Sequence, residues 1–96
     1  KLVEMATEIE MAKDFSYHLV LDHLEKKDIT KKVAMANCYN AELANRVAYH
    51  CVQLHGGYGY MDEYEICRDA LDVRMGSIAA GTTEVMKTII ARMMGL

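Results

Sequence analysis

Gln53-Leu54-His55-Gly56-Gly57-Tyr58-Gly59-Tyr60 is the stretch of this 96-residue chain that most constrains its fold. An amphipathic pattern ends there on consecutive glycines, which reach the left-handed αL conformation of helix C-caps at little cost. A second segment, Ala80-Gly81-Thr82-Thr83-Glu84-Val85-Met86, places a glycine just before another helical pattern. Glycines beside helix ends also let bare backbone N–H groups approach a phosphate or carbonyl oxygen. Two such segments on one short chain indicate a bound ligand.

Two long helices are predicted before the first glycine segment. The first runs from residue 1 to about Glu25 on a stripe, spaced by threes and fours, of Met5, Ile9, Ala12, Ser16 and Leu19, which is widened by Ala6, Phe15 and Val20. A charged break follows, and Asp28 or Thr30 can cap a second helix that ends at Leu54. The alanines of this second helix permit close approach to a neighbouring helix.

Two shorter helices are predicted after it. Asp62 with Glu65 three residues later resembles a capping box, which starts a third helix that runs to about Val73. Thr82 or Thr83 caps a fourth, whose apolar stripe is Val85, Met86, Ile89, Ile90 and Met93. Since no segment has the pattern of a strand, the fold class predicted for residues 1–96 is all-α, an antiparallel bundle of four helices in one domain.

Composition narrows the function classes. Lys plus Arg number 11 against 14 Asp plus Glu, so the basic footprint of a nucleic-acid or anionic-membrane binder is absent. No apolar run approaches the roughly 18 residues that a membrane span needs. The three cysteines, Cys38, Cys51 and Cys67, lack metal-like spacing and indicate a reducing compartment: the cytoplasm, or the mitochondrial matrix in a eukaryote.

No metal site is expected either. Acidic and imidazole side chains share one side of the first helix at Asp14, His18, Asp22 and His23. A di-iron bundle would need Glu-x-x-His pairs, and the sequence has none, so these residues are interpreted as a solvated polar face.

One family resemblance covers essentially the whole chain, most strongly from Ala41 onward. The residues that carry it are Cys51-Val52-Gln53-Leu54-His55-Gly56-Gly57-Tyr58-Gly59-Tyr60-Met61, Glu63-Tyr64, Asp72, Arg74, Ile78, Gly81-Thr82, Glu84 and Ile90-Ala91-Arg92. In this order and spacing they resemble the end of an acyl-CoA dehydrogenase. The wording of the glycine motif is most similar to the long-chain branch of that family.

The resemblance implies an FAD-dependent oxidoreductase that removes a proton from Cα and a hydride from Cβ of an acyl-CoA. Family members have a helical N-terminal domain, a middle β domain and a C-terminal helical bundle, and are usually homotetramers. An electron-transfer flavoprotein would be the electron acceptor. Residues 1–96 would form an incomplete C-terminal bundle whose first helix precedes Lys1, and the amphipathic register already present at Lys1-Leu2-Val3 agrees. Alone, the chain is expected to be inactive.

The resemblance also assigns binding residues. Contacts to the adenosine and pyrophosphate of FAD, typically the FAD of a neighbouring subunit, fall on Gln53, Leu54, His55, Gly56 and Gly57. Further FAD contacts, near the start of the last helix, fall on Thr82, Thr83 and Glu84. The substrate-binding turn falls on Ala80 and Gly81, where the N–H at the Ala80 position and a flavin ribitol hydroxyl hold the thioester carbonyl. His55 is assigned no proton transfer.

Ala80 departs from the commonest family pattern. Many members place the catalytic glutamate immediately before the Gly-Thr pair, and alanine cannot abstract a proton. The long-chain and isovaleryl branches are similar to this chain, because their base projects from an earlier helix. No catalytic residue is therefore predicted within the chain, and the base is expected upstream of Lys1. Glu65, Leu71 and Ala79 also depart from the family pattern. These departures weaken the prediction of the substrate more than the prediction of the fold.

Two alternatives stay open. The first is a family relative that keeps the bundle and has lost dehydrogenation, for which Ala80 is the motivating residue. The second is a helical interaction module without a cofactor, against which the two glycine segments count. An inward-facing glutamate on the preceding helix, together with a β-rich middle domain, would distinguish the enzyme from both.

Overall fold

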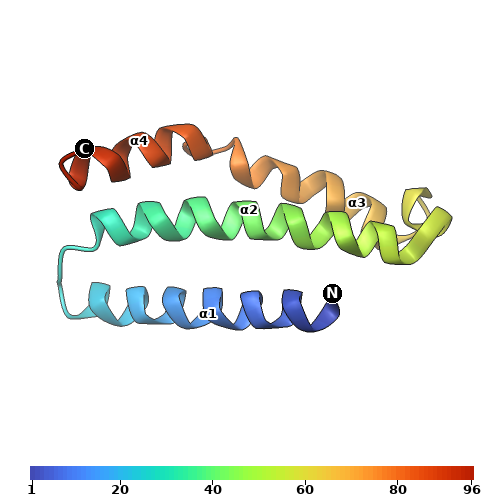
Figure 1. Cartoon of the computed structure of the whole chain (residues 1–96), viewed down its shortest axis with the longest axis horizontal. Coiled ribbons are helices and arrows are strands. Elements are labelled where there is room, and N and C mark those ends of the chain that lie inside the picture. Colours follow the sequence, from blue (N-terminus) through green and yellow to red (C-terminus); the bar gives the residue numbers. More distant parts are fainter.

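The computed structural model describes every residue from Lys1 to Leu96, and all its regular elements are helical. α1 (Leu2–Leu24) and α2 (Thr30–His55) form an antiparallel pair, and α2 leads into the 3₁₀ turn η1 (Gly56–Tyr60). The chain then returns along α2 through α3 (Glu65–Val73), the 3₁₀ turn η2 (Arg74–Ser77) and α4 (Thr83–Met93). Figure 1 shows α2 between α1 on one side and α3 with α4 on the other. The predicted all-α antiparallel fold with four helices is confirmed.

The central helix α2 has two packing faces because its residues repeat every 3.6 positions. Asn40 and Leu43 lie toward α1, where the Asn40 side-chain amide donates to Ser16 Oγ at 3.1 Å. Ala41 lies on the opposite face, against Gly76 of η2. Glycine and alanine at this crossing let η2 approach α2 closely.

The apolar core is thin. Nine of the 96 residues are buried, and no large side chain is completely enclosed. The buried apolar side chains are Met5, Leu19, Ala34, Ala36, Leu43 and Ala48. Half of these are alanines, and all three alanines are on α2, so this helix packs against its neighbours through short side chains. None of the helices carries an apolar stretch that could reach across a bilayer.

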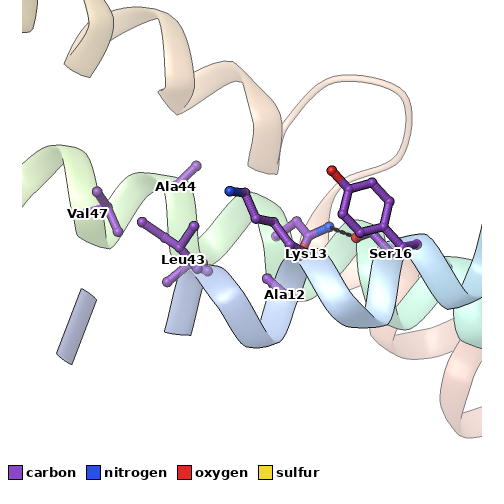
Figure 2. A pocket seen from close by; sticks show the side chains of 9 residues that line it. Ala12, Lys13, Ser16, Leu43, Ala44 and Val47 are labelled. Atoms are coloured by element: carbon purple, nitrogen blue, oxygen red, sulfur yellow. Dashed lines mark hydrogen bonds between the residues drawn. The ribbon is translucent and has the colours of Figure 1, made fainter. Parts of the chain in front are cut away.

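A groove of about 490 Å³ follows the seam between α1 and α2. In Figure 2 the side chains of Ala12 and Ser16 on α1 and of Leu43 and Val47 on α2 line it. The predicted α1 stripe does face α2, with Met5 and Leu19 buried and the residues between them half-buried. The three residues predicted to widen that stripe are exposed instead: Ala6, Phe15 and Val20. Phe15 lies at one edge of the stripe, and Ala6 and Val20 lie at the other.

Most helix ends lie within a residue of their predicted positions. The Asp28 carboxylate accepts the N–H of Thr30 at 3.1 Å and its hydroxyl at 2.8 Å, although Ile29 is the N-cap residue of α2. Thr82 caps α4 as predicted, because its hydroxyl oxygen accepts the N–H of Val85 at 3.2 Å.

The capping box predicted at Asp62 and Glu65 is wrong. Tyr64 is the N-cap of α3, is extended, and makes no side-chain capping bond. Asp62 lies outside the helix, where its carboxylate accepts the thiol of Cys67 at 3.7 Å and its carbonyl oxygen accepts from Arg68. The spacing imitates a capping box, but the extended backbone before α3 moves Asp62 away from the helix end.

The αL conformation predicted for the glycine that ends α2 is also wrong. Gly56 has a φ of 62° but a ψ of −142°. This region is open essentially to glycine alone. The chain therefore needs glycine here, but it turns directly into η1 rather than closing an αL cap.

Candidate functional site

The turn formed by residues 78–82, between η2 and α4, has an unusual backbone. Ala80 has a φ of 55° and Gly81 a φ of 106°. A non-glycine residue in the left-handed region costs about 1–2 kcal/mol, so the surrounding structure must hold Ala80 in place. Strain of this kind is concentrated at binding and catalytic sites.

Three successive backbone N–H groups in this turn, those of Ala80, Gly81 and Thr82, donate to no protein acceptor. We call them the free amides. They lie immediately before the N-terminus of α4, where the helix dipole adds partial positive charge. Donors of this kind can bind a phosphate or carbonyl oxygen and stabilise negative charge that develops on it.

Side chains of α2 hold both ends of this turn. The Thr83 hydroxyl, at the start of α4, donates to the Glu42 carboxylate at 2.8 Å. The Asn45 side-chain amide donates to Ser77 Oγ in η2 at 2.9 Å and to the Ala41 carbonyl oxygen at 2.8 Å. Ser77 and Thr83 are buried, at 8% and 6% exposure, so both hydroxyls are anchored inside the chain.

The charge of Glu42 is matched by its neighbours. Hydrogen bonds from Thr83 and Ser77 hold the pKa of its carboxyl below the ordinary value, and the positive charges of Lys87 and Arg74 act in the same direction. Glu42 is therefore ionised at neutral pH. Since it already accepts a hydrogen bond from the chain itself, its carboxylate acts as an anchor for α4.

A polar recess of about 600 Å³ opens beside the turn. It is lined by the two α2 anchors and by residues of η2, of the turn and of the start of α4: Glu42, Asn45, Arg74, Ser77, Ile78, Thr82, Thr83 and Glu84. All three α4 residues predicted to contact FAD thus meet at one place. Their side chains differ in availability, because the Thr82 hydroxyl caps α4, Thr83 donates to Glu42, and the Glu84 carboxylate makes no hydrogen bond or ion pair.

The other predicted group, residues 53–57, lies at the far end of α2. Its five residues are all exposed: Gln53, Leu54, His55, Gly56 and Gly57. Gln53 is 11 positions beyond Glu42, which is roughly 16 Å along a helix that rises 1.5 Å per residue. Within one chain these residues and the 78–82 turn therefore do not contact the same end of a ligand.

The glycines of this second group differ in what they require. A Cβ on Gly59 would meet the Val52 carbonyl oxygen at 2.6 Å, so the packing of the chain itself explains that glycine. A Cβ on Gly57 would meet nothing within 4 Å, and its φ is not in the left-handed region. The fold of this chain gives no reason for glycine at position 57. His55 Nδ1 lies 2.7 Å from the Cys51 carbonyl oxygen, a contact within α2.

Sequence reasoning missed Glu42, Asn45 and Ser77. One signal was available: Glu42 and Asn45 interrupt the small-residue face of α2 that also carries Ala41 and Ala48. Polar side chains on a face that packs against another element need partners. The partners themselves, 32 and 41 positions away, could not be identified from spacing. No group of three His, Cys, Asp or Glu residues is placed to hold a metal ion.

Comparisons with known proteins agree over the whole chain. Residues 1–95 match the family described as acyl-CoA dehydrogenase, C-terminal domain. The long-chain specific acyl-CoA dehydrogenase, mitochondrial, of Sus scrofa is 45% identical over 92 residues, which is 96% of this chain and 21% of that protein. The Caffeyl-CoA reductase-Etf complex subunit CarC of Acetobacterium woodii is 38% identical over 93 residues, 97% of this chain and 24% of that protein.

A solved structure matches equally well. The crystal structure of an acyl-CoA dehydrogenase from Geobacillus kaustophilus superposes with a TM-score of 0.97 at 49% identity, covering 99% of this chain and 25% of that one. The chain thus spans about a fifth to a quarter of the length of these relatives.

Proposed function

Because this chain belongs to the acyl-CoA dehydrogenase family and matches its C-terminal domain, we propose that it is the FAD-binding and subunit-contact part of an enzyme that desaturates acyl-CoA thioesters between Cα and Cβ. FAD, when bound, would accept the hydride from Cβ. In the family of which this chain is a member, an electron-transfer flavoprotein would then take the electrons, and one relative is indeed a subunit of a reductase-Etf complex.

The observation that supports this proposal most is the set of free amides of Ala80, Gly81 and Thr82. Removal of a proton from Cα places negative charge on the thioester oxygen. An N–H already directed at that oxygen lowers the barrier, since it interacts more strongly with the charged state than with the neutral carbonyl. The Ala80 N–H is the donor that we assign to the thioester, with Gly81 completing the substrate turn.

The proton itself must go elsewhere. Ala80 has no side-chain base, and Glu42 already accepts the Thr83 hydroxyl. Following the resemblance to the long-chain and isovaleryl branches, we assign the base to an upstream helix of the full-length protein rather than to a residue of this chain. A carboxylate there would abstract the Cα proton while the free amides hold the oxygen.

The residues present fit a flavin. Gln53 offers amide donors and an acceptor at an exposed position, and Gly57 leaves open space where a Cβ would stand. Thr82, Thr83 and Glu84 would contact FAD from the start of α4. Following the family resemblance, we assign residues 53–57 to the FAD of a neighbouring subunit, and we assign the residues at the start of α4 to the chain's own FAD. The assembly would be a homotetramer, in the cytoplasm or the mitochondrial matrix.

The test uses the full-length protein that contains this chain. Anaerobic titration with a series of saturated acyl-CoA thioesters should bleach the oxidised flavin absorbance for at least one chain length. An S-alkyl-CoA thioether of that same length is the matched control: it lacks the carbonyl oxygen, so it should bind far more weakly and leave the flavin oxidised. Equal binding of thioester and thioether would contradict the role given to Ala80.

Flavin binding has its own readout. Gly57→Val would place a branched side chain in the open space beside η1, and the flavin content per subunit, measured by absorbance after gel filtration, should fall. Val52→Ala, which trims a half-buried side chain on α2 close to η1, is the control for a general loss of folding. Undiminished flavin content in Gly57→Val would remove residues 53–57 from the proposed site.

A second candidate function has one observation in its favour. A relative of 38% identity is named as part of a reductase complex rather than as a dehydrogenase. If no saturated thioester bleaches the flavin, and a chemically reduced flavin is rapidly reoxidised by an unsaturated acyl-CoA, the protein is a reductase that uses the same carbonyl contact.

A further inference from the structure

We propose that Glu42 and Asn45 of α2 are positioning residues: by holding Thr83 and Ser77, which flank the 78–82 turn, they fix the free amides in the geometry that binds the thioester oxygen. This inference rests on the proposed function of the turn. It adds two residues on a different helix that act on the turn through Thr83 and Ser77. We call the pair the α2 clamp.

The clamp holds the turn at two points. Glu42 and Asn45 are three positions apart and therefore share a helix face. Glu42 accepts the Thr83 hydroxyl at 2.8 Å on the α4 side, and Asn45 donates to Ser77 Oγ at 2.9 Å on the η2 side. The five residues between Ser77 and Thr83 make no side-chain hydrogen bond to α2. These two side-chain hydrogen bonds therefore tie both ends of the turn to α2.

Burial separates the anchors from the turn that they hold. Ser77 and Thr83 are buried, whereas Ala80 is exposed and Gly81 half-buried. Gly76 of η2 also lies against α2, since a Cβ there would sit 3.5 Å from the Ala41 methyl group. A buried hydroxyl that loses its partner is destabilised, so removing one clamp residue should loosen one end of the turn.

The clamp would hold Ala80 in its strained backbone conformation. An alanine with a φ of 55° relaxes toward negative φ when its neighbours allow it. Such a relaxation would rotate the peptide planes on both sides and redirect the Ala80 N–H. Fixing both flanking hydroxyls to one rigid helix prevents this rotation, which is preorganisation of an oxyanion-binding donor.

The experiment compares three variants of the full-length protein. Glu42→Ala removes one side of the clamp, and Glu42→Gln keeps an oxygen that can accept from Thr83. Ser16→Ala is the matched control, because it removes a half-buried hydroxyl that accepts an interhelical hydrogen bond of 3.1 Å at the α1–α2 seam, away from the turn. Two kinds of measurement are made: the kcat and KM of flavin reduction by acyl-CoA, and hydrogen exchange at two protected amides, one within the turn and one in the first turn of α4.

Those amides are Ala79, which donates to the Met75 carbonyl oxygen at 2.8 Å, and Met86, which donates to the Thr82 carbonyl oxygen at 2.9 Å. In Glu42→Ala we expect kcat to fall about 10- to 100-fold, the range for a misplaced catalytic contact, with KM changing much less. Exchange at Met86 should accelerate. Glu42→Gln should recover most of kcat, and Ser16→Ala should match the wild type in kcat and in exchange at both amides.

The outcomes separate the two proposals. If Glu42→Ala matches Ser16→Ala in kcat, or if Glu42→Gln is as impaired as Glu42→Ala, the positioning role is overturned. If none of the acyl-CoA thioesters reduces the flavin of the wild-type protein, the proposed function fails. The exchange data then decide the clamp alone. Unchanged exchange at Met86 in Glu42→Ala would overturn the clamp whatever the activity.

Discussion

Residues 1–96 expressed alone should be helical and should self-associate. The structure exposes 7127 Å² of surface, whereas a compact monomer of this mass exposes about 5,500 Å². Its Cα radius of gyration is 15.6 Å, against about 12.5 Å expected for a globular chain of this length. The excess of about 1,600 Å² equals the total area buried in one standard protein interface.

The excess surface includes an apolar strip along α1. Met11 is 64% exposed and Phe15 is 40% exposed, and both line a second groove beside α2. Contiguous apolar surface of this kind drives association, because burying it removes apolar area from water. We therefore expect a dimer or larger species in which one copy covers this strip on another.

Sedimentation velocity over a concentration series is the assay. The weight-average mass of the wild-type chain should rise with concentration, and Met11→Lys should shift it toward the monomer. Leu71→Lys replaces an apolar residue on α3 that is slightly more exposed, at 74%, and should change the association much less. A chain that stays monomeric at every concentration and unfolds in one cooperative urea transition would refute the reasoning.

Three further predictions concern the 78–82 turn in the full-length protein. Ala80→Gly should raise the thermal midpoint, because relief of about 1–2 kcal/mol of left-handed strain exceeds the roughly 0.4–1 kcal/mol entropic cost of glycine, whereas Ala79→Gly bears only that cost and should lower it; calorimetry that shows two equal losses would contradict the strain. Ala80→Glu should leave flavin content largely unchanged and should not replace the upstream base, whose removal should reduce turnover at least about 10²- to 10⁴-fold; full activity without that base would sink its assignment. The pKa of Glu42 is lowered in the folded state, so its contribution to stability is complete above the unfolded-state pKa and is lost as the pH falls through the folded-state pKa. Below about pH 4 the thermal midpoint of the wild type should therefore fall more steeply than that of Glu42→Gln. The charged neighbours Lys87 and Arg74 stay protonated in this range, so parallel midpoint curves would exclude a contribution from the Glu42 carboxylate.

Local signals predicted the helices well. A stripe repeated over many turns defines α2 almost to the residue, and the threonine at position 82 is the N-cap of α4 because its hydroxyl reaches the Val85 N–H. Both features depend on residues within one or two turns of each other. The glycine at position 56 was likewise identified as a break, although its ψ could not be known, since glycine alone permits several conformations.

The clamp and the false capping box show the limit of such signals. Asp62 and Glu65 have the spacing of a cap, but Tyr64 is extended and Asp62 instead contacts Cys67 and Arg68. The pairing of Glu42 with Thr83 spans 41 positions, so only the return of the chain along α2 brings these side chains together. Periodicity identifies which face of a helix packs against a neighbour, and it carries no information on which neighbour arrives there.

The alanine interior of α2 determines which inherited changes this domain can tolerate. Ala34, Ala36 and Ala48 are three of the four buried residues of α2 and three of the six buried apolar residues of the domain. At these alanines every substitution except glycine adds atoms, so damage arises chiefly through overpacking, typically about 1–3 kcal/mol, rather than through cavities. Single-nucleotide changes of alanine codons yield mostly larger residues, among them valine, threonine and the acidic pair. Variants along this helix should therefore rank in severity by side-chain volume and charge, whereas ordinary cores are damaged chiefly by truncation.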